Sequence, residues 1–141
     1  MRRAALAALF AFWPLAAGAS PDHWAAVSKT AMAITGDIAI DGDILTFADG
    51  KSIRLVPYEM ARTGDWAASG DRIAGDVFKI EPPTSPKLRR GQPFCDEPAS
   101  FVVLWTYGEG ELTLNVYSGD AAPTGLTDTD SLCATYSYEL H

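Results

Sequence analysis

Residues that could act as nucleophiles or as acid and base catalysts are scarce in this chain. Its two histidines are His23 and His141, and a serine or cysteine nucleophile usually needs a well-placed histidine base. Both lie near an end of the expected mature chain, so we interpret them as solvated residues. We predict no catalytic residue and no cofactor. With both cysteines expected in a disulfide, no Cys/His set remains for a zinc site.

Carboxylates are the second candidate for chemistry, because aspartates gather in two groups. They could form a weak calcium site, but neither group has EF-hand spacing, and aspartate next to glycine is typical of turns. Two acids could also serve glycoside hydrolysis, although the spacing singles out no pair. We therefore expect turn residues and no metal site in these groups, which are Asp37, Asp41, Asp43 and Asp49, and Asp120, Asp128 and Asp130.

The segment that most favours a binding role is PTSPKLRRGQP, from Pro83 to Pro93. It contains Lys87, Arg89 and Arg90, and prolines on both sides limit the entropy lost on docking. The sequence predicts a stiff basic loop that could enter an acidic cleft. The alternative is a solvated loop that only connects two strands.

A β-hairpin over residues 101–117, FVVLWTYGEGELTLNVY, is the predicted centre of the fold. A turn at residues 109–110 would place Val103 opposite Val116 and make one hairpin face wholly apolar, so we expect that face in the core. The other face would be mixed and suited to a ligand or a partner, which makes Tyr117 a candidate binding residue. The members of this mixed face are Val102, Leu104, Thr106, Thr113, Asn115 and Tyr117.

Aromatic side chains have two interpretations. Trp105 and Tyr107 would share the apolar hairpin face, which favours core positions over a ligand site. Tyr136 and Tyr138, near the end of the chain, could line an interior or cover one end of it. A barrel of eight strands can hold one ligand or be filled by its own side chains.

The two cysteines, Cys95 and Cys133, are expected to form one disulfide that encloses the hairpin. The chain-entropy model gives about 4 kcal/mol of stabilisation for a loop of about 39 residues. A redox role is not favoured, because no C-x-x-C motif is present.

Residues 1–19 have the pattern of a secretory signal peptide, with two arginines, a short apolar run and small residues at Ala17 and Ala19. We expect cleavage after Ala19, a single domain over residues 20–141, and a periplasmic or secreted location without a membrane anchor. The mature chain has 9 Lys and Arg against 18 Asp and Glu, a net charge of −9. We therefore expect neither nucleic acid nor an anionic membrane as a partner, and a partner, if there is one, to be a protein in the cell envelope. We expect a monomer.

The remaining pattern predicts a mainly β fold. Residues 21–28 predict a short helix, and alternation over residues 32–40 predicts a strand that turns at Asp41-Gly42 and pairs Ile38 with Leu45.

A three-residue loop at 48–50 would then place Leu45 opposite Ile53, and the next strand would stop at Pro57. Trp66 is expected to anchor a weakly patterned segment. With later strands over 72–81 and 132–140, the sequence predicts a compact antiparallel barrel or sandwich with about seven strands, and the barrel is favoured because the last strand could close on an early one.

Four stretches, AMAITGDI, LTFADGKSIRL, FKIEPPTSPKL and CATYSYE, resemble a set of small exported alphaproteobacterial proteins of uncharacterised function. The resemblance covers most of the mature domain. It implies export and a single small domain, and it implies no activity.

Three functions from different classes follow. The first is a non-enzymatic protein-binding or inhibitor-like module that offers the Lys87 to Arg90 loop to a basic cell-wall hydrolase with an acidic cleft. The second is a lipocalin-like carrier of a small apolar ligand. The third, and least favoured, is a hydrolase that uses two carboxylates in one cleft.

Overall fold

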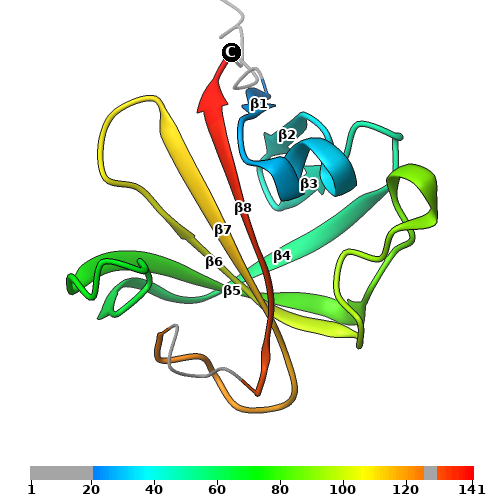
Figure 1. Ribbon diagram of the computed structural model, residues 1–141. Coiled ribbons are helices and arrows are strands. Elements are labelled where there is room, and N and C mark those ends of the chain that lie inside the picture. Colours follow the sequence, from blue (N-terminus) through cyan, green and yellow to red (C-terminus); the bar gives the residue numbers. More distant parts are fainter. Residues whose placement is uncertain (1–20, 126–129) are drawn as a thin grey trace, which may run out of the picture.

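Eight antiparallel strands in chain order form a closed barrel in the computed structural model, which describes residues 21–125 and 130–141 (Figure 1). The expected signal peptide, residues 1–19, lies outside the described residues. Among the residues described, no helix has the length and apolar character to cross a membrane. The strands are β1 Asp22–Ala26, β2 Ile38–Asp41, β3 Ile44–Thr46, β4 Ser52–Gly64, β5 Ile73–Thr84, β6 Ala99–Trp105, β7 Glu111–Ser118 and β8 Leu132–Leu140.

The predicted helix over residues 21–28 is wrong, because this segment contains strand β1. Trp24 pairs with Ile38 of β2 on one side and with Leu140 of β8 on the other. β1 therefore closes the barrel and satisfies the backbone groups that an open β8 edge would leave unpaired.

A helical turn, η1 (Ala31–Thr35), replaces the beginning of the strand predicted over residues 32–40. It ends at Gly36, which has φ 62° and whose N–H donates to the Ala31 carbonyl at 2.7 Å. The following β2–β3 hairpin pairs Leu45 with Ile40 rather than Ile38. This shift of two residues leaves the same side chains facing inward, because side chains alternate with a period of two.

The β3–β4 hairpin has the predicted register, with Leu45 opposite Ile53 and Gly50 at φ 90°. The predicted strand end at Pro57 is wrong, since β4 continues to Gly64. The β4–β5 ladder shifts register next to Pro57 and again further on, and these irregularities accommodate a residue that has no N–H to donate.

The β6–β7 hairpin differs from the predicted register by one residue. Val103 lies opposite Asn115 rather than Val116, and Leu104 lies opposite Leu114. A shift of one residue turns every side chain of one strand to the other face. In the structure both faces of the hairpin are largely buried, one inside the barrel and one under a second cluster on its outer side.

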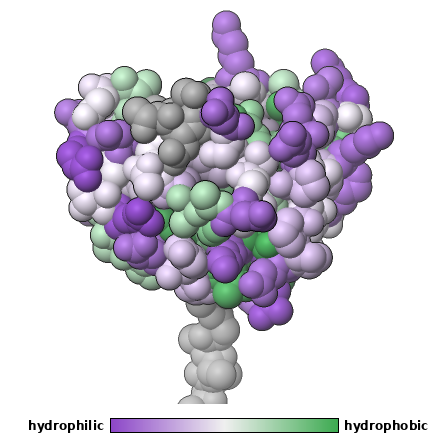
Figure 2. Space-filling view, turned by 90° about the horizontal axis from the view of Figure 1, so that it is seen from below, coloured by the Kyte–Doolittle hydropathy of each residue, from purple (hydrophilic) through white to green (hydrophobic). Residues whose placement is uncertain are grey.

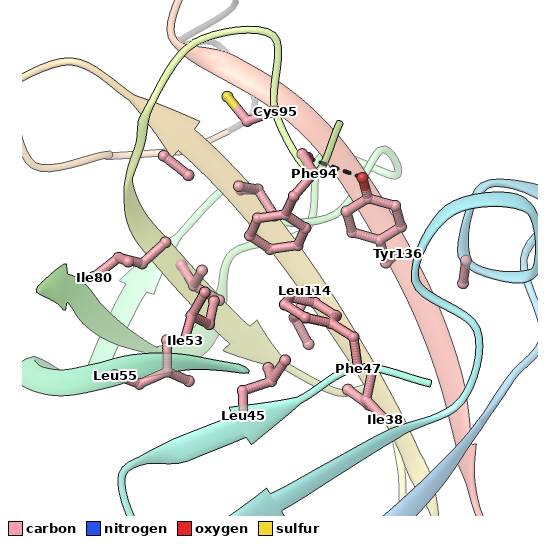
Figure 3. Close-up of a cluster of buried hydrophobic side chains, with 14 of the residues drawn as sticks. Ile38, Leu45, Phe47, Ile53, Leu55, Ile80, Phe94, Cys95, Leu114 and Tyr136 are labelled. Carbon is pink, nitrogen blue, oxygen red and sulfur yellow. Dashed lines mark hydrogen bonds between the residues drawn. The ribbon is translucent and has the colours of Figure 1, made fainter. Parts of the chain in front are cut away.

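Side chains of the barrel wall and of one loop fill the barrel interior (Figure 3). Phe94 enters from the loop between β5 and β6, with its ring 5.6 Å from Tyr136 and 5.1 Å from Phe47. The Tyr136 hydroxyl donates to the Phe94 carbonyl at 2.9 Å. Phe47, Phe94 and Tyr136 thus occupy space in which a carrier would hold its ligand.

Trp66 packs against the outer face of the β6–β7 hairpin and forms a second core there. This confirms its predicted anchoring role. Trp66 is fully buried, and a Cβ at Gly64 or Gly75 would lie 2.6 or 2.7 Å from its indole ring. Asn115 lies in this outer core and is also fully buried. Viewed from below, the hydrophobic residues that reach the surface form small patches among hydrophilic ones (Figure 2).

Candidate functional site

The predicted basic loop is a closed structure between β5 and β6. The Leu88 N–H donates to the Gln92 carbonyl at 2.8 Å, and the Phe94 N–H donates to the Pro86 carbonyl at 3.1 Å. One 3-10 turn, η2 (Arg89–Gly91), forms its tip. Backbone hydrogen bonds therefore define the conformation of the tip.

Buried groups attach this loop to the barrel. Leu88 is 5% exposed and Phe94 is fully buried. Cys95 and Cys133 form the predicted disulfide, which ties the end of the loop to β8. The loop is thus held by the packing of Leu88 and Phe94 on either side of its tip and by the disulfide at its end.

Lys87, Arg89 and Arg90 are all exposed on this loop. The Arg89 guanidinium donates to the Met32 carbonyl at 3.1 Å. Arg89 and Arg90 also line a hollow of about 320 Å³ with Lys29 and the half-exposed Met32. The structure therefore adds a fourth cation from the segment between β1 and η1.

These four cations, Lys29, Lys87, Arg89 and Arg90, take part in no ion pair among the residues that the structure describes. In a chain with an expected mature charge of −9, this surface is a local positive region. It can attract a carboxylate-bearing surface.

Lys29 had no signal in the sequence, because it lies 60 residues before Arg89. Both line the same hollow because η1 packs beside the loop, and only the fold brings them together. Gly36, at the end of η1, has the Arg89 side chain so close that a Cβ would lie 3.2 Å from its guanidinium.

Tyr117 does not join the basic loop. It is fully buried in the outer core, and its hydroxyl donates to the Gly125 carbonyl at 3.2 Å. The one-residue change of register moved it from the predicted mixed surface to a packed one. Tyr117 therefore supports the fold at this position.

The aspartates near the first turns make local contacts. Asp37 accepts the Ala26 N–H at 2.9 Å, Asp49 accepts the Lys51 N–H at 3.0 Å, and Asp43 pairs with an arginine at 3.0 Å. Asp128 lies outside the described residues. Within residues 21–125 and 130–141, no group of three or more His, Cys, Asp or Glu residues is arranged to hold a metal ion.

Burial dominates the electrostatics of the tyrosines inside the barrel. It raises the pKa of Tyr136 well above its ordinary value of 10.0, with a further rise from the nearby Asp96 carboxylate. It also raises the pKa of Tyr138, although the hydroxyl contact with Thr35 at 2.7 Å opposes part of that rise. Both phenols stay neutral at physiological pH and support the core.

The structure thus brings Arg89 and Arg90 together with Lys29 around one hollow, leaves Lys87 on the same loop outside that lining, and places Tyr117 elsewhere. Comparison of the chain with protein-family models, with curated proteins and with solved structures found no match. The function is therefore to be inferred from the geometry of the cationic loop.

Proposed function

We propose that this protein is a non-enzymatic binding module that presents Lys87, Arg89 and Arg90 to an acidic surface on a protein partner in the cell envelope. The observation that carries the proposal is a set of exposed cations that belong to none of the ion pairs within the described part of the chain, on a loop anchored by Leu88 and by the Cys95 disulfide. We infer a monomeric protein without nucleic-acid partners or a membrane anchor.

Rigidity makes this loop suited to binding. Each flexible side chain that becomes fixed at an interface costs about 0.5–1.5 kcal/mol. Arg89 is already oriented by its hydrogen bond to the Met32 carbonyl, and the η2 backbone is closed by its own hydrogen bonds. Part of this ordering cost is therefore met before the partner arrives.

An acidic cleft fits the loop better than a flat acidic surface. The loop tip projects three charges over a short span of backbone, and the acidic body around it repels other carboxylates. Glycoside hydrolases of the cell wall have two carboxylates in the substrate cleft. The sharpest form of the proposal is therefore an inhibitor that inserts this loop into such a cleft.

Export fits this function. The disulfide is typical of proteins in oxidising compartments, and we infer that residues 1–19 direct the chain there. Carriage of an apolar ligand inside the barrel receives no support from the packing, because Phe47, Phe94 and Tyr136 fill that space. We do not propose a hydrolase, because the two carboxylates that lie opposite each other on β7 and β8, Glu111 and Glu139, are both exposed and no difference in burial makes one an acid and the other a base.

The test is inhibition of cell-wall hydrolysis by the mature protein, with egg-white lysozyme as the enzyme. The variant K87A/R89A/R90A should raise the concentration needed for half inhibition at least tenfold, because it lacks the three positive charges that contact the acidic cleft. The variant R54A/R62A/R72A removes the same number of charges from surface ion pairs elsewhere and should change this concentration less than twofold. Exposed pairs contribute about 0.2–1 kcal/mol each, so both variants should stay folded.

Equal inhibition by the wild-type protein and by K87A/R89A/R90A would exclude the loop as the binding element. A wild-type protein that inhibits no cell-wall hydrolase would exclude the inhibitor form of the proposal.

A further inference from the structure

A second surface with binding character crosses the outer face of β6, β7 and β8. Two hollows of about 410 and 290 Å³ adjoin there and share Trp105, Tyr107, Thr113 and Ser137. The larger extends toward Trp66, and the smaller extends toward β1 and the end of β8. Together they form one groove, which is separate from the basic loop.

An aromatic wall borders this groove. Tyr107, which the sequence placed in the core, is 57% exposed. Its ring meets Trp105 edge to face, with centroids 5.2 Å apart, and its hydroxyl is hydrogen-bonded to Ser69 across the larger hollow. Tyr107 is therefore an exposed aromatic ring that is held in place at both ends.

Small hydroxyl side chains form the floor. Thr113 and Ser137 pair across β7 and β8, with their hydroxyl oxygens 3.4 Å apart. Thr135 lines the same floor further along β8. Each hydroxyl can both donate and accept a hydrogen bond, which suits a ligand that itself carries many hydroxyl groups.

Two carboxylates stand at one end of the groove. Glu111 and Glu139 are directly opposite each other on β7 and β8, line the smaller hollow, and are exposed. No ion pair among the residues described includes either of them. Like charges opposite each other destabilise a sheet, and a cationic ligand would relieve their repulsion.

The closed barrel argues against a peptide in this groove. β6, β7 and β8 are each paired on both sides, so an extended peptide finds no free edge to which it could add a strand. A ligand in this groove can therefore contact side chains but cannot extend the sheet. Sugar rings match such a surface, because they present apolar C–H faces to aromatic rings and hydroxyl edges to polar side chains.

We propose that this groove binds an oligosaccharide of amino sugars. The rings lie against Tyr107 and Trp105, the sugar hydroxyls contact Thr113 and Ser137, and an ammonium group lies between Glu111 and Glu139. This binding does not depend on the basic loop.

Calorimetric titration of the mature protein at pH 6 tests the proposal with three tetramers that differ at one position of each ring. These are the β-1,4-linked tetramers of glucosamine, N-acetylglucosamine and glucose. The glucosamine tetramer should bind at least tenfold more tightly than the glucose tetramer, because it alone carries ammonium groups. The variants E111Q/E139Q and Y107A should each weaken its binding at least fivefold.

The variant E81Q/E97Q is the matched control, since it removes two exposed carboxylates elsewhere and should change the affinity less than twofold. Equal affinity for the three tetramers, or an E111Q/E139Q variant that binds like the wild type, would overturn the proposal. Tetralysine that binds as tightly as the glucosamine tetramer would also overturn it, because attraction of any cation would then explain the binding.

Discussion

Asn115 offers the sharpest test of the hairpin register, because its surroundings depend on that register. In the observed pairing it is fully buried. Its side-chain oxygen accepts the Trp105 indole N–H at 3.0 Å, and its amide nitrogen donates to the Trp66 carbonyl at 2.9 Å. In the register expected from sequence, with Val103 opposite Val116, Asn115 would lie on a partly exposed face.

Replacing Asn115 with Ala should lower the free energy of unfolding by about 3 kcal/mol. The change leaves one buried donor and one buried acceptor unpaired, and each costs about 1–3 kcal/mol. Urea unfolding followed by tryptophan fluorescence measures the loss. Since stabilities of about 5–15 kcal/mol are typical, the variant should still fold.

Asn115→Asp adds a dependence on pH. A protonated carboxyl group can donate to the Trp66 carbonyl as the amide does, but a carboxylate cannot, and burial raises the pKa of the new carboxyl group. Because this folded-state pKa exceeds the unfolded value, the stability is present at low pH and is lost as pH rises. A rise of two units in this pKa would cost about 2.2 kcal/mol at pH 7 relative to pH 4.

Ser52→Asp, at an exposed strand position, is the control and should show almost no such pH dependence. A loss below about 0.5 kcal/mol for Asn115→Ala, together with a pH-independent effect of Asn115→Asp, would show that Asn115 is solvated. The observed register would then be incorrect.

Two further predictions concern the barrel. Replacing Cys95 and Cys133 with Ala should lower the free energy of unfolding by about 4 kcal/mol in the chain-entropy model, because the bond spans 38 positions; a loss below about 1 kcal/mol in urea unfolding would contradict it. Above about pH 10 the stability should fall by up to about 2.7 kcal/mol per pH unit, because Tyr136 and Tyr138 have raised pKa values when folded and ionise first in the unfolded chain. Unfolding of the Tyr136→Phe and Tyr138→Phe variants should depend less on pH in that range, and unchanged dependence would argue against their burial.

Local signals in the sequence were sufficient to predict part of the barrel. A three-residue loop that ends at Gly50 predicts that Leu45 pairs with Ile53, and the structure has this pair. The loop closes with Gly50 at φ 90°, a conformation that favours glycine. The disulfide was predicted from the presence of two cysteines in a chain that we expect to be exported. An antiparallel barrel or sandwich was predicted, and the barrel was favoured because the long last strand could close on an early one; the structure has the barrel.

The register of the β6–β7 hairpin could not be predicted from periodicity. Alternation identifies a strand's inner face only when the outer face is exposed and polar. Here Trp66 covers the outer face, so Val102 and Val103, neighbours in sequence, are both buried. The pattern then fits two registers equally, and the turn residues did not decide between them.

Long-range contacts explain the other differences. Five residues of β1 are too few to separate a strand from a helix by pattern, and the pairing with β2 and β8 decides the outcome. Long-range packing also places Lys29 and Arg89 around one hollow, and strand pairing places Glu111 opposite Glu139. These pairs exist only after the barrel has closed.

The most direct test of the proposed function is photo-crosslinking from the loop inside the cell envelope. A photoreactive amino acid at Arg90 should form an adduct with a cell-wall hydrolase, and the site of attachment should map to its acidic cleft. The same amino acid at Arg54, which is exposed and forms an ion pair with Asp43, should form no such adduct. Adducts from position 54 but none from position 90 would contradict the proposal that the cationic loop is the binding element.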